Sequence, residues 1–217
     1  MRIILLTKSK KYHNYCVTGI REDTGEWVRL VSEDSSIHNA VTVVDMTYED
    51  NSEAQILDIV EVKIKEHNPN YYQPENYVYD STYYWEKIGQ ATIDHVLEII
   101  TQNDDFYVFH NDEKKLQKTF VQSLSTDEQY SLKLIELDEV EICVRDWDGD
   151  GRLSITASFT YNDIEYKYLK ITDEYFKSQF NGEGWYKFKD VVLVISLADL
   201  YDRDDCHYKL VASIIYE

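Results

Sequence analysis

The chain has 217 residues, 43% of them hydrophobic, and its 41 acidic and 22 basic side chains give it a net charge of −19. This hydrophobic content suffices for packed cores and excludes a disordered chain, and the length favours two small domains. The longest apolar runs, such as VVLVISL, are too short to span a membrane. The acidic balance disfavours a general grip on duplex DNA, because it repels a polyanion at long range.

The charge is unevenly distributed along the chain. Residues 1–31 hold six basic and three acidic side chains, which leaves 16 basic and 38 acidic residues, a balance of −22, for the remainder. We therefore expect any anion-binding site to lie in the amino-terminal segment.

Two features bear on the cellular compartment. Cys16, Cys143 and Cys206 make an odd count without metal-ligand spacing, which favours a reduced protein. The first residues, MRIILLTKSKK, contain too short an apolar run for a signal peptide. We expect a cytoplasmic protein that does not enter a membrane.

The first part of the chain predicts short strands followed by helices. Period-two patterns predict strands at residues 2–8, 15–20, 26–32 and 55–67, with a loop before the last of them. Apolar residues at helical spacing predict helices at 92–100 and 111–124. We assign residues 1–130 to an amino-terminal domain with a loop and a helical insertion.

The remaining residues, 131–217, form a second predicted domain with a clearer pattern. Strands are predicted at residues 140–145, 153–161, 164–171, 191–197 and 207–217, with a short helix or irregular segment at 172–180. Three meandering strands, a helical connection and two further strands are the order of an OB-fold barrel, which commonly binds oligonucleotides. A five-stranded open sheet would show the same pattern.

The acidic turn RDWDGDGR resembles the start of a calcium-binding loop. Asp146, Asp148 and Asp150 occupy the first three ligand positions of an EF-hand, and Gly151 follows them. Position twelve, however, is Ala157 instead of a bidentate glutamate, and the flanking segments are strands instead of helices. We therefore favour an exposed turn without a cofactor, with a weak calcium site at residues 146–151 as the alternative.

Cationic and aromatic residues gather near the amino terminus. Lys8, Ser9 and Lys10 lie in a basic loop with tyrosines beside it, a composition that suits a phosphate group and a stacked base. A solvated lysine turn is the alternative reading. Trp27 and Arg29 share one face of a strand, where the arginine either holds a phosphate or pairs with an acidic neighbour.

A tyrosine-rich segment, NYYQPENYVYDSTYYW at residues 70–85, combines seven aromatic rings with three polar side chains. Tyrosine suits stacking platforms and interfaces, and Gln73, Glu75 and Asn76 have the groups needed to recognise the polar edge of a ligand. The alternative is a connection that packs across two domains, which we favour slightly because aromatic residues more often serve packing.

The sequence contains no recognisable catalytic constellation. GxSxG, HExxH, Walker and CxxC motifs are absent, and the six histidines are scattered. A binding protein is therefore favoured over an enzyme.

Several blocks resemble the dual OB-containing domain family. The blocks are LTKSKKYHNYCVTGI, GEWVRLVS, QPEN, ITDEYF, VISLADL and YKLVASII, which together extend over nearly the whole chain. Thr18, Leu30 and Glu174 depart from the family pattern, which has alanine, proline and proline there. The resemblance implies a mainly β, α+β fold of two OB-like five-stranded barrels packed together, and a module found in bacteria and mobile elements near defence systems.

The resemblance also nominates residues for a ligand site. The nominated residues are Ser9, Lys10, Cys16, Gly19, Trp27, Arg29, Gln73, Glu75, Asn76, Thr172, Asp173, Ser196 and Lys209. Lys209 stands out as a basic residue in an acidic half of the chain. For Thr172, Asp173 and Ser196 we favour strand-end and helix-cap hydrogen bonds over ligand contact.

These observations favour a non-catalytic module that binds a nucleotide or a single-stranded nucleic acid through Lys8, Lys10, Arg29 and stacked rings. The competing hypothesis is an acidic protein-interaction module that imitates a nucleic acid and occupies a basic partner, since residues 32–217 carry the balance of −22. An enzyme acting on nucleotides would need converging carboxylates that the sequence does not reveal.

Overall fold

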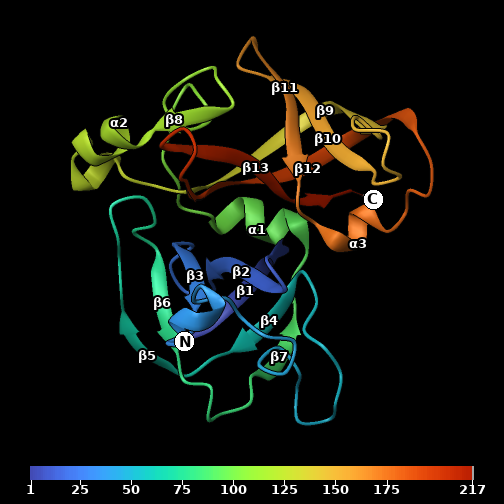
Figure 1. The fold of residues 1–217 in the computed structure, drawn as a ribbon. Coiled ribbons are helices and arrows are strands. Elements are labelled where there is room, and N and C mark those ends of the chain that lie inside the picture. The colour runs from blue at the N-terminus through green and yellow to red at the C-terminus, as the bar shows by residue number, and fades with distance from the viewer. Residues whose placement is uncertain (217) are drawn as a thin grey trace. The chain divides into compact units, whose positions relative to one another are not determined.

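The computed structural model describes residues 1–216 and divides into two compact units, Met1–Gln102 and Asn103 to the carboxy terminus (Figure 1). Strands account for 50% of the chain and helices for 11%, which confirms the predicted mainly β fold class.

The first unit is built on a curled seven-stranded sheet. Its strands are β1 (Arg2–Lys11), β2 (Asn14–Arg21), β3 (Trp27–Val31), β4 (Asp58–Glu61), β5 (Ile64–His67), β6 (Asn76–Tyr79) and β7 (Glu86–Gln90), and its helices are η1 (Ser35–Ile37) and α1 (Ile93–Ile99). The strand order is β5-β6-β3-β2-β1-β4-β7. Only Val62 and Lys63 separate β4 from β5 along the chain, yet β5 lies at one edge of the sheet and β4 next to the other. The sheet must therefore curl into a half-barrel.

The second unit contains a closed barrel. Its strands are β8 (Lys115–Gln117), β9 (Leu132–Arg145), β10 (Ser154–Tyr161), β11 (Ile164–Ile171), β12 (Gly184–Tyr201) and β13 (Cys206–Ile215), and its helices are α2 (Lys118–Ser123), η2 (Thr126–Glu128) and α3 (Glu174–Lys177). The order β11-β10-β9-β12-β13-β8 is completed by a parallel pairing of β11 with β13, so five strands form a ring (Figure 1). This closure has the strand order of an OB-fold and rejects the open-sheet alternative for this unit.

Two predicted elements differ from the structure. The strand predicted at 55–67 is broken into β4 and β5, and the helix predicted at 111–124 is correct only from Lys118 to Ser123. Residues 115–117 instead form β8, because the edge of β13 offers a hydrogen-bonding partner: Leu116 lies opposite His207 and is buried. Tertiary pairing here overrides a helical spacing of apolar residues.

Residues 103–130, which we assigned to the first domain, fall in the second compact unit. Lys133 Nζ donates to the carbonyl oxygens of Asn103 and Asp105, at 3.1 and 3.0 Å. The backbone N–H of Val108 donates to the Tyr166 hydroxyl at 2.9 Å. These contacts tie residues 103–108 to the barrel of the second unit.

Gly19 occupies a crowded point of the first sheet. It lies in β2 opposite Leu5, and a Cβ added there would lie 2.1 Å from the Ile4 carbonyl oxygen. The absence of a side chain therefore permits β1 and β2 to approach each other. This close approach explains why the CVTG block has a glycine at position 19.

We predict that Gly19→Ala lowers the free energy of unfolding by about 1–3 kcal/mol or more, because the backbone must shift to admit the methyl group. Urea titration followed by circular dichroism measures the effect. Gly89→Ala is the matched control, since its added Cβ would meet only Ile59 Cδ1 at 3.7 Å. Equal stabilities of the two variants would contradict the steric explanation.

Candidate functional site

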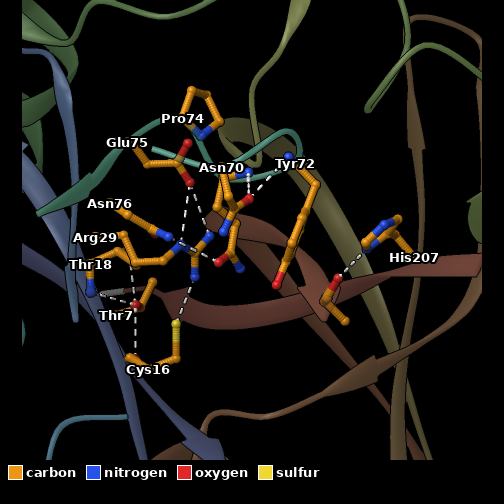
Figure 2. A network of polar contacts seen from close by, with 12 residues as sticks. Thr7, Cys16, Thr18, Arg29, Asn70, Tyr72, Pro74, Glu75, Asn76 and His207 are labelled. Carbon is orange, nitrogen blue, oxygen red and sulfur yellow. Dashed lines mark hydrogen bonds and ion pairs between the residues drawn. The ribbon is translucent and has the colours of Figure 1, made fainter. Parts of the chain in front are cut away.

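Arg29 lies at the centre of a buried polar network in the first unit (Figure 2). The parallel pairing of β3 with β6 places Arg29 opposite Asn76 and next to Glu75. Its Nη2 and Nε lie 3.1 and 3.3 Å from Glu75 Oε1, and the backbone N–H of Arg29 donates to the Glu75 carbonyl at 2.8 Å. Arg29 Nη1 also donates to Cys16 Sγ at 2.7 Å.

The QPEN segment reaches the same network. Asn76 Nδ2 donates to Gln73 Oε1 at 3.4 Å, and Asn70 Oδ1 accepts the backbone N–H of Gln73 at 2.8 Å. The structure thus brings Arg29, Gln73, Glu75 and Asn76 together, although they are distant in sequence (Figure 2). The side chains of Arg29 and Glu75 are only 3% and 7% exposed, so the pair positions β3 against β6.

We predict that Arg29→Met and Glu75→Gln each lower the unfolding free energy by about 3–5 kcal/mol, because each leaves a buried charge without its counter-ion. The double variant should lose less than the sum of the two, and a thermodynamic cycle from urea titrations measures this coupling. Lys65→Met, which breaks the exposed pair of Lys65 with Glu33, is the control with an expected loss below about 1 kcal/mol. Additive losses at Arg29 and Glu75 would refute the pairing.

Other predicted ligand residues of the first unit are engaged or shielded. Lys8 Nζ lies 2.9 Å from Glu53 Oε1 and 3.2 Å from the Ala54 carbonyl. Ser9 is 5% exposed. Trp27 is half-buried, and its indole N–H has no hydrogen-bond partner within residues 1–216. Lys8 and Ser9 therefore present less to solvent than the sequence suggested.

A second group of residues gathers at the end of the β1–β2 hairpin, where Tyr12 and His38 are exposed and Lys10 and Tyr15 are half-buried. Lys10 Nζ lies 4.9 Å from the centroid of the Tyr15 ring, and Tyr12 stacks on His38 with a centroid distance of 3.9 Å and an interplanar angle of 21°. Tyr12 is 60% exposed. We call Lys10, Tyr12, Tyr15 and His38 the hairpin cluster.

His38 is the member that the sequence did not suggest. It belongs to the loop between β3 and β4, and a bridge between Tyr15 and Val41 holds this loop beside the hairpin. Both Tyr12 and His38 have left-handed backbone angles, with φ of 52° and 57°. Residues other than glycine rarely adopt this conformation, so the stacked pair is held by its surroundings.

Lys209 lies in β13 of the second unit. Its Nζ donates to the carbonyl oxygen and to Oδ1 of Asn111, both at 2.7 Å, and lies 5.0 Å from the centroid of the Tyr166 ring. The residue is 1% exposed, and this burial lowers the pKa of its amine to about 7. A neutral amine still has the two protons that these hydrogen bonds require, so Lys209 anchors the loop around Asn111 in either state.

Because the pKa of Lys209 falls from 10.5 to about 7 on folding, the unfolded chain binds more protons between these values. Stability therefore rises with pH in this window. We predict that Lys209→Met removes about 1–3 kcal/mol of the rise in unfolding free energy between pH 7 and pH 9. Urea titrations at several pH values measure it, with the exposed Lys189→Met as control. If the unfolding free energy of Lys209→Met rises with pH as steeply as that of the parent chain, Lys209 does not titrate near neutrality.

Two carboxylates of the acidic turn, those of Asp146 and Asp150, are engaged locally. Asp146 Oδ1 accepts the backbone N–H of Gly149 at 2.7 Å, and its Oδ2 accepts that of Gly151 at 2.7 Å. Asp150 forms an ion pair with Arg152. Within residues 1–216, no group of three histidine, cysteine or acidic side chains is placed to hold a metal ion. The favoured turn without a cofactor and its alternative, a weak calcium site at Asp146, Asp148 and Asp150, both stay predictions.

The motif at the start of α3 has a structural role. Asp173 Oδ1 accepts the backbone N–H of Phe176 at 3.0 Å and Oδ2 accepts that of Ile214 at 3.3 Å, so one carboxylate caps the helix and ties it to β13. Thr172 Oγ1 donates to the Val211 carbonyl at 3.3 Å. These are the cap and strand-end hydrogen bonds expected of this motif.

Comparisons with known proteins give one match. The model of a family described as the dual OB-containing domain matches residues 1–214 of the chain. No curated protein and no solved structure matches it. No helix in the described part of the chain is both long and apolar enough to cross a membrane.

Proposed function

Because the chain belongs to the dual OB-containing domain family, we propose that it is a non-catalytic module that binds a nucleotide or a single-stranded nucleic acid. The observation that carries the proposal is the hairpin cluster, in which Lys10 and the Tyr12 ring, stacked on His38 from the loop between β3 and β4, belong to the end of the first hairpin. This turn joins the first two strands of the first unit, and in OB-folds the corresponding loop contributes to oligonucleotide binding.

The chemistry of the hairpin cluster suits such a ligand. Stacking of a base on an aromatic side chain contributes about 1–3 kcal/mol without reading sequence. Tyr12 presents an exposed ring, and Lys10 Nζ donates to the His13 carbonyl at 3.3 Å, a contact that leaves its positive charge unneutralised and able to attract a phosphate. In contrast, Lys8 and Arg29 already face Glu53 and Glu75. Rings and one or two lysines would therefore hold the ligand.

A cytoplasmic setting forms part of the proposal. Cys16, Cys143 and Cys206 are free thiols, which suits a reducing compartment.

A second candidate, an acidic module for a basic protein partner, is favoured by a groove on the second unit. The carboxylates that line it are Asp138, Glu139, Glu141, Asp163 and Glu165, against the single cation Lys187. Lys187 is itself paired with Glu139 at 2.6 Å. A lysine-rich segment would find a complementary surface there.

We predict that fluorescence anisotropy detects binding of a labelled oligothymidylate to the full chain, and that Tyr12→Ala and Lys10→Ala each weaken it about 5- to 100-fold. Affinity should fall with salt, by roughly 0.7 in log K per log unit of salt for each phosphate neutralised. Tyr175→Ala, which removes a tyrosine 79% exposed on α3, is the matched control.

The same titration separates the two candidate functions. Absence of oligonucleotide and mononucleotide binding at low salt would reject the first. If a labelled oligolysine peptide binds instead, and Glu141→Gln with Glu165→Gln weakens it, the acidic module is the better description.

A further inference from the structure

A row of exposed rings crosses the outer face of the second unit. Trp147 lies in the turn between β9 and β10, Tyr168 in β11 and Trp185 in β12. Their ring centroids lie 6.3 Å apart from Trp147 to Tyr168 and 6.3 Å apart from Tyr168 to Trp185, at angles of 86° and 64°. We call these three residues the aromatic row.

The rings of the aromatic row remain accessible although they adjoin each other. Trp147 is 54% exposed, Trp185 52% and Tyr168 38%. Exposure of two indole rings and a phenol ring to water is unfavourable in free energy. Other aromatic residues of the same protein are fully buried, such as Trp85, which is 2% exposed. Contiguous exposed apolar surface of this kind marks binding sites more often than scattered single residues do.

The backbone of β11 is distorted where it presents Tyr168. Ala157 pairs with Leu169 and Phe159 with Tyr166, so Lys167 and Tyr168 together face Ser158 and form a bulge. Tyr168 has a φ of 56°, and its N–H donates to Ser158 Oγ at 3.1 Å. A bulge re-aims a side chain, and residues other than glycine in the left-handed conformation are strained and cluster at functional sites.

Two cations border the aromatic row. The Arg145 guanidinium lies 5.1 Å from the Trp147 ring and Lys114 Nζ lies 5.3 Å from the Tyr168 ring. Neither side chain forms an ion pair within residues 1–216, so both charges are available to a ligand. A row of rings with free cations at its border is complementary to stacked bases linked by phosphates.

A purely structural role accounts for part of this arrangement. Trp185 pairs with Cys143 across the strands, and Cys143 with Thr156, so these residues share one face of the sheet. Cys143 and Thr156 are only 1% and 7% exposed although they lie on that outer face, which indicates that rings shield them. Shielding uses one side of the rings and explains neither their open faces nor the bulge at Tyr168.

We propose that the aromatic row is a second ligand site, which stacks the bases of a single-stranded nucleic acid while Arg145 and Lys114 contact its phosphates. The site rests on the proposed function but lies in the other unit and uses none of the residues of the hairpin cluster. It extends ligand binding to the carboxy-terminal barrel, where Lys209 was the one nominated residue for which the sequence analysis did not favour a cap or strand-end role.

The test uses the full chain and an oligothymidylate of about ten nucleotides, within the range of strand lengths that one OB-fold covers. Trp147→Ala and Trp185→Ala should each weaken binding about 5- to 100-fold in fluorescence anisotropy. Tyr168→Asn should do the same while it keeps the bulge, because asparagine tolerates the left-handed conformation. Tyr175→Ala should bind as the parent chain does, and circular dichroism verifies folding.

A fluorescence measurement places the contact at the rings themselves. Trp147 and Trp185 are two of four tryptophans, and stacked bases should quench their emission on titration with unlabelled oligonucleotide. The double variant Trp147→Phe, Trp185→Phe should retain affinity within about threefold, since phenylalanine also stacks, and should lose most of the quenching. A merely structural role predicts no quenching in the parent chain.

The outcomes distinguish this inference from the proposed function. If Tyr12→Ala weakens binding while the three aromatic-row variants bind normally without quenching, the hairpin cluster stands and the aromatic row is refuted. If the aromatic-row variants lose binding and Tyr12→Ala binds normally, the aromatic row stands as the ligand site and the hairpin cluster is refuted. If a labelled proline-rich peptide binds in place of the oligonucleotide and Trp147→Ala abolishes this, the ligand class assigned here is wrong.

Discussion

In both units, the pairing of the last strand of a three-stranded meander with a later parallel strand determines the shape of the sheet. β3 pairs with β6 in the first unit, and β11 pairs with β13 in the second. Each pairing bends a three-stranded antiparallel meander back on itself, which no hairpin can do. In the first unit it also places Glu75 against Arg29, so the curvature of the sheet and the neutralisation of a buried cation depend on the same contact.

The amino-terminal segment is rich in basic residues, but most of them are neutralised by carboxylates in the structure. The basic residues of the first 31 positions that pair with carboxylates are Arg2, Lys8, Arg21 and Arg29. Most of the local positive charge is thus used inside the first unit. What the surface offers a ligand is chiefly aromatic, with a lysine or arginine close to the rings, and this favours ligands with flat faces over extended polyanions.

Much of the fold followed from local patterns. The alternation of Ile155, Ala157 and Phe159 on one face of β10 predicted a strand in the second unit. The order of strands favoured an OB-fold barrel but left an open sheet as the alternative, and the pairing of β11 with β13 decides for the barrel. The split of the strand at 55–67 and the formation of β8 were missed, because both depend on partners far away in the chain. Short-range periodicity contains no information on which edge is free to pair.

The candidate site was less predictable from the sequence than the fold. Lys10 and its neighbouring tyrosines were visible in one short segment, whereas His38 comes from a loop that a single bridge holds in place. The residues of the Arg29 network were nominated separately, but their meeting depends on a parallel pairing that sequence spacing does not specify. Tyr168 and its neighbours gave no signal, because a bulge aligns rings from three separate stretches of chain.

The short break between β4 and β5 has an evolutionary consequence. Because residues 58–67 pair with β1 and β7 at one end and with β6 at the other, their number sets the circumference of the first unit. An added or deleted residue there would displace both seams together. Family members should therefore keep the length of this crossing segment constant.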